Sequence, residues 1–445
     1  MTQKYKYLHF VDYSTFLLWD IKRYFMTQVS SSYPIVRLGD YIQEESAKYK
    51  INDPSKTYGI LGVNNQTGIF DAYREQGSNI KQKYKKMQVG WIAYNPYRVN
   101  VGSIGMRTDK QNYEYISPAY VVFSCKEKKL SPEFLYLLMK TDVFNQIIRE
   151  NTTGSVRQNL NYSVLSNLQI PLPSLDEQNN IVAAYNSALA QSALYARQAQ
   201  DIDSQIEAYL QDILGIQQTD TATKRNAIGK FLWLVNSKDI ICWDVYNVKT
   251  THTGKYDSVY LSEIISKLST GTTPPTHNKE YFAGGIDFYT PADINGDMYL
   301  GDAERHISQS AIEDKKARLF SRGDLLFVGI GSTVGKVGLV SKDVVSSNQQ
   351  ITGITFNTSR IMPEYAFVYM HYFKESTTAD KSKTTLPIIN QEKIGQIQIP
   401  LPPLVIQNEI VSHISSLRAE RKALQQQSLS LRSDAQHQFT KTIFN

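Results

Sequence analysis

The pentapeptide Gln-Ile-Pro-Leu-Pro occurs twice in this chain, at residues 169–173 and 398–402. The same offset of 229 residues relates 178–182, which reads Gln-Asn-Asn-Ile-Val, to 407–411, which reads Gln-Asn-Glu-Ile-Val. Further matches recur in the same order at offsets from 224 to 233: Trp19-Asp20 with Trp243-Asp244, Gly90 with Gly323, Gly102 with Gly335, Pro132-Glu133 with Pro363-Glu364, and Asn161 with Asn390. Chance does not produce such an ordered series, and a repeat of this length defines the architecture of a chain. We therefore expect a duplicated unit.

The composition is that of a globular protein too long for one core. The chain has 445 residues, of which 41% are hydrophobic and 11% aromatic. Only Cys125 and Cys242 are present, which excludes a disulfide framework and a four-cysteine metal site and fits a reducing cytosol. No signal peptide and no run near the ~20 apolar residues of a membrane span is found, so we expect a cytoplasmic protein. The formal charge of +6 permits a polyanionic partner without requiring one.

Each copy has a globular part and a helical part. The globular parts mix β-branched and aromatic runs, such as 120–125 and 350–356, with turn clusters and one helical stretch after Pro132 or Pro363. We therefore predict two mixed α/β domains. The expected boundaries are 1–173 for the first domain, 174–216 for the first long helix, 217–225 for a polar linker, 226–402 for the second domain and 403–445 for the second long helix.

Alternating steps of four and three residues predict the two long helices. The seam of the first helix is Tyr185, Ala188, Ser192, Tyr195, Ala199, Ile202, Ile206, Tyr209 and Ile213, and that of the second is Ile410, Ile414, Leu417, Arg421, Leu424, Ser428 and Leu431. The polar seam residues Ser192, Arg421 and Ser428 weaken a free coiled coil but suit two helices that pack on each other in one register. Gly215 should end the first helix. The prolines of the repeated pentapeptide cannot continue a helix, and we interpret the phrase as a stiff joint between domain and helix.

Three fragments resemble catalytic motifs without meeting their requirements. Residues 329–336 read Gly-Ile-Gly-Ser-Thr-Val-Gly-Lys, but a phosphate-binding loop needs glycine where Ile330 stands and Ser or Thr where Val337 stands. Residues 95–97 resemble the N-P-P-Y motif of amino-methyltransferases, and 327–331 resemble their F-x-G-x-G loop. The repeat places these last two fragments at the same position of the two copies, so they cannot form two halves of one site. A strand leading into a turn is the simpler interpretation, and the chain is expected to bind rather than to react.

The chain resembles the specificity (DNA-recognition) subunits of type I restriction-modification enzymes. In that family a phrase like I-P-L-P-P-L-x-x-Q-x-x-I-V introduces a conserved helix after each of two target-recognition domains. Residues 170–182 here read IPLPSLDEQNNIV, and residues 399–411 read IPLPPLVIQNEIV. The second domain has further similar phrases, which are GTTPP at 271–275, GDLLF at 323–327 and GSTVG at 331–335. The first domain departs from the family, with NNQTG at 64–68 where a G-T-T-P phrase is expected.

The resemblance implies an α+β fold, with two pseudo-repeated globular α/β target-recognition domains separated by two long antiparallel helices that form a coiled-coil spacer. It implies a non-catalytic subunit that reads double-stranded DNA as two different half-sites around an unread spacer. Two modification (methyltransferase) subunits would methylate adenine with S-adenosylmethionine, and restriction or motor subunits would use ATP and Mg. No cofactor and no metal are expected on this chain itself.

Base reading requires Arg, Lys, Asn, Gln, Ser or Thr on projecting loops, and phosphate anchoring requires basic or hydroxyl side chains. The candidates in the first domain are Arg98, Asn100 and Arg107 around the glycine turn at 102–105, and Arg157, Gln158 and Asn159 in the loop before the first repeated pentapeptide. Those in the second domain are Thr272, Thr273, His277, Lys279, Ser332, Thr333, Lys336, Gln349, Lys381 and Lys383. The alternative for each is a solvated loop residue. The basic run 81–86 is interpreted either as a phosphate contact or as a solvated face, while Trp19 and Trp243 favour core packing over base stacking.

Two rival functions remain open from the residues alone. A two-armed helical scaffold would recruit partners without nucleic acid, and its binding would be insensitive to salt, unlike DNA binding. A stand-alone adenine methyltransferase would bind S-adenosylmethionine as an isolated chain.

Overall fold

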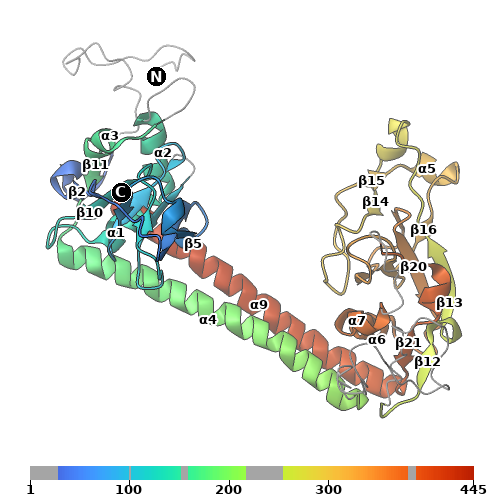
Figure 1. Ribbon diagram of the computed structural model, residues 1–445. Coiled ribbons are helices and arrows are strands. Elements are labelled where there is room, and N and C mark those ends of the chain that lie inside the picture. The colour runs from blue at the N-terminus through green and yellow to red at the C-terminus, as the bar shows by residue number, and fades with distance from the viewer. Residues whose placement is uncertain (1–28, 100–101, 152–158, 217–253, 379–386, 445) are drawn as a thin grey trace, which may run out of the picture. The chain divides into compact units, whose positions relative to one another are not determined.

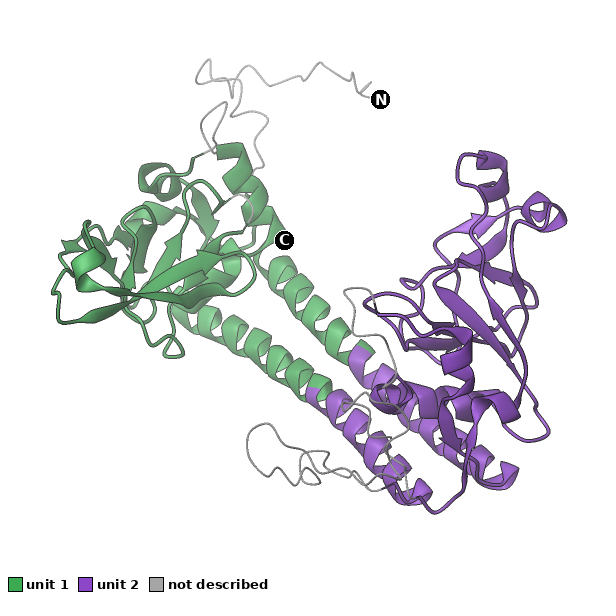
Figure 2. Ribbon diagram, turned by 45° about the vertical axis from the view of Figure 1, so that its right-hand side comes forward, with its two compact units in different colours: residues 1–196, 426–445 green, residues 197–425 purple. Residues whose placement is uncertain are grey.

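The computed structural model describes residues 29–99, 102–151, 159–216, 254–378 and 387–444. The chain divides into two compact units (Figure 2), of which unit 1 comprises residues 1–196 and 426–445 and unit 2 comprises residues 197–425. Each long helix therefore belongs partly to unit 1 and partly to unit 2, whereas the sequence boundaries treated the helices as separate elements. The linker at 217–225 and both Trp19 and Trp243 lie outside the described residues.

Unit 1 contains eleven strands in its described part (Figure 1). They are β1 (Ile35–Arg37), β2 (Ile42–Glu44), β3 (Lys48–Tyr49), β4 (Thr57–Asn64), β5 (Gly68–Gln76), β6 (Tyr84–Lys86), β7 (Ile92–Tyr94), β8 (Ile104–Met106), β9 (Tyr115–Ile116), β10 (Val121–Cys125) and β11 (Gln169–Pro171). Its helices are the 3-10 turns η3 (Leu38–Asp40) and η4 (Gly77–Asn79), then α1 (Pro132–Met139), α2 (Asp142–Asn151), α3 (Tyr162–Ser166) and the first part of α4 (Leu175–Leu214).

Unit 2 follows a closely related order of elements. Its strands are β12 (Ser258–Tyr260), β13 (Ile265–Thr270), β14 (Ile286–Tyr289), β15 (His306–Ile307), β16 (Leu319–Phe320), β17 (Leu325–Val328), β18 (Val337–Leu339), β19 (Val345–Ser347), β20 (Ile351–Phe356) and β21 (Gln398–Pro400). Its helices are η7 (Leu261–Glu263), η8 (Lys279–Phe282), α5 (Gln309–Glu313), α6 (Pro363–Tyr372), α7 (Lys374–Thr377), α8 (Gln391–Gly395) and the first part of α9 (Leu404–Ile443), whose end packs in unit 1.

One antiparallel four-stranded sheet is built twice. Unit 1 orders it β2-β10-β7-β8, and unit 2 orders it β13-β20-β17-β18. The registers agree, since Ile92 lies opposite Phe123 in unit 1 and Leu325 lies opposite Ile354 in unit 2. This confirms the duplication predicted from the sequence, and we call this sheet the shared sheet of each unit.

The repeated pentapeptide forms the same short strand in both units. In unit 1, β11 pairs antiparallel with β1, and Ile170 lies opposite Val36. In unit 2, β21 pairs with β12, and Ile399 lies opposite Val259. The isoleucine of each phrase is fully buried, and the long helix begins four residues after the strand. The phrase is therefore a two-stranded anchor that fixes where each helix starts, as the proline content suggested.

Two matched pairs of glycines have a conformation that other residues rarely adopt. Gly90 and Gly323 have φ of +85° and +88°, and Gly102 and Gly335 have φ of +80° and +85°. Each pair flanks equivalent strands of the shared sheet. Because glycine carries no Cβ, it enters this left-handed region at little cost. The repeat therefore retains glycine where the turns before and after these strands require it.

A buried glutamine ties each long helix to its domain. In unit 1 the Oε1 of Gln178 accepts a hydrogen bond from the Ser131 amide at 2.8 Å, and its Nε2 donates to the carbonyls of Lys129 and Pro173 at 3.3 and 2.9 Å. In unit 2 the Oε1 of Gln407 accepts from the Met362 amide at 2.8 Å, and its Nε2 donates to Arg360 and Pro402 at 3.0 and 2.8 Å. Both glutamines are 0% exposed. The motif residue common to both copies is thus a structural clamp.

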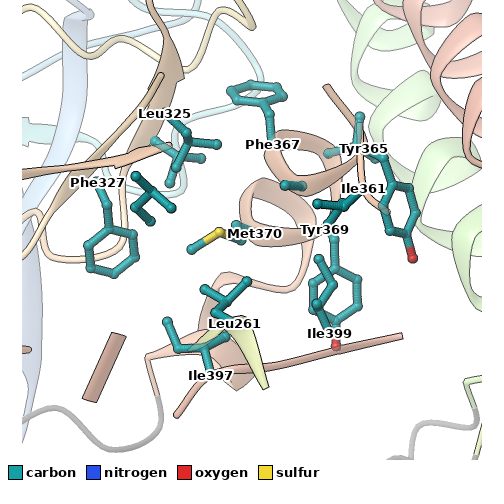
Figure 3. Packing of buried hydrophobic residues seen from close by; sticks show 14 of the residues in the cluster. Leu261, Leu325, Phe327, Ile361, Tyr365, Phe367, Tyr369, Met370, Ile397 and Ile399 are labelled. Atoms are coloured by element: carbon teal, nitrogen blue, oxygen red, sulfur yellow. The ribbon is translucent and has the colours of Figure 1, made fainter. Parts of the chain in front are cut away.

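The main core of each unit lies between the shared sheet, the helix that begins at Pro132 or Pro363, and the long helices. Figure 3 shows the core of unit 2, where Tyr369 of α6 lies beside Ile399 and where Leu325 and Phe327 of β17 approach from the sheet. The hydroxyl of Tyr365 donates to the carbonyl of Pro400 at 2.8 Å. In unit 1 the equivalent helix α1 has Phe134 against Phe439 of α9, with ring centroids 6.0 Å apart. The long helices are therefore part of both domain cores.

The second sheet differs between the units. Unit 1 has five strands in the order β3-β6-β9-β4-β5, with a long β4–β5 hairpin, while unit 2 has four strands in the order β15-β14-β19-β16. These sheets lie in the sequence segments where the repeat has no matches. The two domains therefore share a scaffold and differ in the subdomain inserted into it.

The helices α4 and α9 pack antiparallel in the part that belongs to unit 1, where Figure 1 shows them side by side. Tyr185 contacts Phe439, with centroids 5.9 Å apart, and Ser192 contacts Ser428. The two serines bond reciprocally, because the Oγ of Ser192 donates to the carbonyl of Ser428 at 2.7 Å and the Oγ of Ser428 donates to that of Ser192 at 2.8 Å. This confirms that Ser192 and Ser428 face each other in the predicted helix seam, where each hydroxyl bonds to the backbone of the other serine.

In unit 2 the same two helices continue antiparallel. Arg421 forms an ion pair with Asp203 at 2.5 Å, and Tyr209 lies 4.3 Å from His413 between ring centroids. Leu210 and Leu214, absent from the predicted seam, are fully buried, because the last turns of α4 join the core of unit 2. Gly215 ends α4 with φ of +64°, as predicted.

His371 of α6 should make unit 2 sensitive to acid. Burial is the largest of the effects that lower its pKa from 6.5 to about 4, and the nearby cations Arg418, Arg421 and Lys374 contribute in the same direction against the opposing charge of Asp203. The unfolded chain takes up a proton near pH 6.5, while the folded chain takes it up near pH 4. Stability is therefore full above pH 6.5 and is lost as the pH falls through this window, by roughly 2–3 kcal/mol. Urea denaturation at pH 7.5 and 4.5 measures this loss. In His371→Gln this loss of stability on acidification should disappear. A variant that loses as much stability as the wild type between these two pH values would show that His371 is not its source.

Candidate nucleic-acid interface

Three loops of unit 2 meet at one end of its shared sheet. Thr270, which ends β13, lies opposite Thr352 near the start of β20, and Val328, which ends β17, lies opposite Ile351. The loops that follow or precede these residues are 271–278, 329–336 and 348–350. Antiparallel pairing therefore gathers segments that are far apart in the sequence, including the phrases GTTPP and GSTVG.

A cavity of about 360 Å³ opens at this end of the sheet, lined by residues of the second and third loops, of the adjoining strands and of the segment 388–392. Its lining residues are Thr270, Gly329, Ile330, Gln349, Gln350, Thr352, Ile388, Ile389, Asn390, Gln391 and Glu392. Gly329 lines it where the chain is crowded, since a Cβ on this residue would lie 2.8 Å from the carbonyl oxygen of Ile389. The lining combines isoleucine side chains with amides and hydroxyls, and Glu392 is the one charged residue among the described residues that line it. A site of this composition suits a flat, hydrogen-bonding ligand.

The polar groups around the cavity form short hydrogen-bonded pairs. The hydroxyl of Thr273 donates to Oε1 of Gln349 at 2.5 Å, and Nδ2 of Asn348 donates to Oε1 of Gln350 at 3.0 Å. Nε2 of Gln391 donates to the hydroxyl of Thr270 at 2.8 Å. These bonds hold the three glutamine amides in place.

The described candidates of the second domain fall in all three loops, with Lys279 directly after the first loop as the first residue of η8. Of these candidates, Gln349 lines the cavity. Thr272, His277, Lys279, Ser332 and Gln349 are exposed, and Thr273, Thr333 and Lys336 are half-buried. Lys381 and Lys383 lie outside the described residues. The segment 329–336 is the turn between β17 and β18, where the amide of Gly335 donates to Val328 and the amide of Val328 donates to Lys336. This confirms the interpretation of strand and turn, since a phosphate-binding loop leads into a helix.

The candidates of the first domain are only partly brought together. Arg98 is exposed in the loop after β7, at the end of the shared sheet that corresponds to the cavity in unit 2. Asn159 lies beside that loop, because the amide of its neighbour Leu160 donates to the carbonyl of Pro96. Asn100, Arg157 and Gln158 lie outside the described residues.

Arg107 does not join this group. The strand β8 separates it from the glycine turn, and three extended residues carry the chain about 10 Å. Its guanidinium donates to the carbonyl of Met87 at 2.5 Å, and its backbone pairs with Trp91. The expected grouping of Arg107 with Arg98 around one turn is therefore wrong, since Arg107 supports the opposite end of the sheet.

The lysines of the basic run 81–86 differ in exposure, because one is buried and the others lie on the surface. Lys85 is 5% exposed, its Nζ donates to the carbonyl of Tyr120 at 2.9 Å, and burial lowers its pKa. Lys86 pairs with Glu114 at 3.1 Å, while Lys81 and Lys83 are exposed. At most part of this run can contact phosphates.

The segment 64–68 does not take the place of the GTTPP phrase. Asn64 closes the β4–β5 hairpin, because its Oδ1 accepts from the amides of Gln66 and Thr67 at 3.0 and 2.7 Å. In the shared sheet β2 corresponds to β13, so the chain after Glu44 corresponds to the phrase at 271–275. The expected position was wrong because the repeat has no match between 45 and 89.

Sequence reasoning missed Gln350, Gln391 and Thr270. Gln391 directly follows Asn390, which the repeat matches to Asn161. Each asparagine caps a short helix: the Oδ1 of Asn390 accepts a hydrogen bond from the Lys393 amide at 3.0 Å, and the Oδ1 of Asn161 accepts one from the Val164 amide at 2.9 Å. The repeat match at Asn390 was therefore the sequence signal that could have drawn attention to Gln391.

The fold and the site define a duplicated recognition protein, in which one α/β scaffold presents two different sets of polar loops. A family model described as "Type I restriction modification DNA specificity domain" matches residues 35–202 and 254–430, and the chain belongs to this family. Both matched segments cover a shared sheet and part of a long helix.

Individual relatives are more distant. The chain is 26% identical over 203 residues to the MjaIX specificity subunit of Methanocaldococcus jannaschii, covering 44% of this chain and 40% of that protein. It is 23% identical over 317 residues to the EcoBI specificity subunit of Escherichia coli, covering 68% and 62%. The matches thus span less than two thirds of these relatives. A solved chain from work on assembly and conformational transition of the type I R-M system is 17% identical, with a TM-score of 0.60 over 94% of this chain and 97% of that one, which shows the shared fold.

In the described residues, no helix is long and apolar enough to cross a membrane. These residues also contain no group of three or more His, Cys, Asp or Glu side chains that could hold a metal ion.

Proposed function

We propose that this chain is the DNA-reading subunit of a type I restriction-modification enzyme. Each domain reads one half of a bipartite target in double-stranded DNA, and the loops at the end of the shared sheet carry the reading side chains. Family membership over both halves of the chain supports this proposal. The observation that carries it is the doubled scaffold, which keeps its core and clamps while its second sheets and loops differ.

Different loops imply different half-sites. Unit 2 presents hydroxyls and amides around its cavity, with Lys279 exposed directly after the loop 271–278, whereas unit 1 presents Arg98 at the corresponding sheet end. Amides and hydroxyls read base edges, and cations also neutralise phosphates.

The chemistry of the enzyme belongs to partner subunits in this proposal. Two modification subunits methylate adenine with S-adenosylmethionine, and restriction subunits use ATP and Mg²⁺, in the cytoplasm. The chain's own contribution is to bind the target and hold it in register. The rival functions predict otherwise, since a scaffold would not need DNA and a methyltransferase would bind S-adenosylmethionine by itself.

Salt dependence tests the proposal. Fluorescence anisotropy of a labelled duplex should give a log affinity that falls linearly with log salt concentration, with a slope of about −0.9 for each phosphate neutralised. Lys279→Gln should make that slope less steep by about one unit and leave base preference unchanged. Lys86→Gln is the control, because Lys86 is already paired with Glu114. Binding that does not respond to salt supports the scaffold, and calorimetric binding of S-adenosylmethionine to the isolated chain supports the methyltransferase.

A further inference from the structure

The cavity of unit 2 stands at a position where the two copies share a backbone and differ in side chains. Because Ile92 opposite Phe123 matches Leu325 opposite Ile354, Gln349 and Gln350 correspond to Pro118 and Ala119 of unit 1. By the 229-residue offset, Gln391 corresponds to Tyr162. All three cavity glutamines are thus replaced in unit 1 by residues without a side-chain amide. Structural need does not explain them, since the same scaffold is built without them.

The three amides offer a defined set of hydrogen-bonding groups. Oε1 of Gln349 and Oε1 of Gln350 each accept one bond, which leaves their Nε2 groups without a partner among the described residues. Nε2 of Gln391 is used on Thr270, which leaves its Oε1 as an acceptor. The cavity therefore presents N–H donors and carbonyl acceptors at its rim, on a rigid support.

This set of groups distinguishes between the bases. The major-groove edge of adenine has an acceptor at N7 and a donor at N6, and side-chain amides match both. Guanine has two acceptors there, which call for two donors such as those of arginine. The one charged residue of the described lining, Glu392, has only acceptors in its ionised form. Ile330 and Ile388 supply apolar surface that suits the methyl group of a paired thymine.

We propose that this cavity receives an A·T base pair of the second half-site, with the glutamine amides reading the adenine edge. The assignment rests on the proposed function and adds to it a base, an edge and a set of residues. Thr273 is a positioning residue in this site, because its hydroxyl fixes the amide of Gln349.

The test uses the full chain assembled with its methylating partners and a duplex that contains the mapped target. Each adenine of the second half-site is replaced in turn by 7-deazaadenine, which lacks the N7 acceptor. At one position this analogue should weaken binding by the wild type about 10-fold. Gln349→Ala or Gln350→Ala should weaken binding to the natural duplex by a similar factor, and that variant should then be insensitive to the analogue. Gln396→Ala is the matched control, since Gln396 is exposed directly after the short helix that begins at Gln391 and does not line the cavity.

The possible outcomes are distinct. Additive losses from analogue and variant at every adenine overturn the assignment, and so does a mapped second half-site without an A·T pair. A wild-type complex that binds no duplex overturns the proposed function itself. Circular dichroism melting of each variant shows whether folding is retained, and Gln349→Ala is the safer variant because Gln349 is exposed.

A specificity change offers an independent readout. Gln349→Glu replaces the N–H donor by an acceptor, and carboxylates accept from N4 of cytosine. The variant should therefore bind relatively better to a duplex in which the A·T pair is replaced by C·G. An unchanged preference with retained affinity overturns the role given to Gln349.

Discussion

Replacing Gln407 with leucine will lower the free energy of unfolding by about 4 kcal/mol, because three backbone groups, one in a buried and two in part-buried hydrogen bonds, lose their partner at once. The side chain of Gln407 is 0% exposed and bonds to Met362, Arg360 and Pro402. An unpaired buried polar group costs about 1–3 kcal/mol, and leucine restores only the apolar volume. Gln178→Leu should have a similar effect in unit 1, where the same three bonds occur.

Urea denaturation followed by circular dichroism measures this loss. Gln426→Leu is the control, since Gln426 is exposed on the same helix and should change stability by less than about 0.5 kcal/mol. Equal effects of Gln407→Leu and Gln426→Leu would show that the clamp does not stabilise the fold.

Exchanging residues 258–400 for the corresponding segment of a related specificity subunit will change one half of the methylated target and leave the other half intact. The ends of this segment lie side by side, because Ser258 pairs with Pro400 and the amide of Leu401 donates to Asp257 at 3.0 Å. Both junctions of the exchanged segment therefore fall in the strand pair formed by β12 and β21. The sequence boundaries 226–402 describe the same module with a longer N-terminal part.

The incoming domain must also pack on the helices that remain. Ile206, Leu210, Ile410 and Ile414 are fully buried in the core of unit 2 and would stay in place. A donor with similar residues on its sheet and its equivalent of α6 is therefore required. Mapping of methylated adenines in cells that express the chimera with partner subunits measures the outcome. A change in both half-sites would contradict independent reading by the two domains.

The sequence predicted the parts of the fold that rest on local pattern and on duplication. The strands at 121–125 and 351–356, the helices after Pro132 and Pro363, and the polar helix seam were all identified. Each depends on neighbouring residues or on a match at a fixed offset. The repeat also matched Gln178 with Gln407, although the sequence did not show that both side chains are buried and bond to the backbone.

The candidate site could be predicted only in part, because it is assembled from distant segments. Thr273, Gln349 and Lys336 were named as loop residues, while Gln391 comes from a helix 121 residues after its partner Thr270. Arg107 was misplaced because a three-residue strand turns it to the other end of the sheet. The position of 64–68 was misjudged because no repeat match crosses the second sheet. Pairing of strands, and not residue type, decides which loops meet.

The reciprocal bond between Ser192 and Ser428 limits how these helices can change length. A seven-residue insertion in α4 alone, after Ala196, would keep this pair together and displace Asp203 from Arg421. A matching insertion in α9 after Gln425 would restore both pairs, because each unit would then keep its own contacts. Insertions and deletions in α4 and α9 are therefore expected to occur together, in equal steps of seven residues that keep the contacts within each unit.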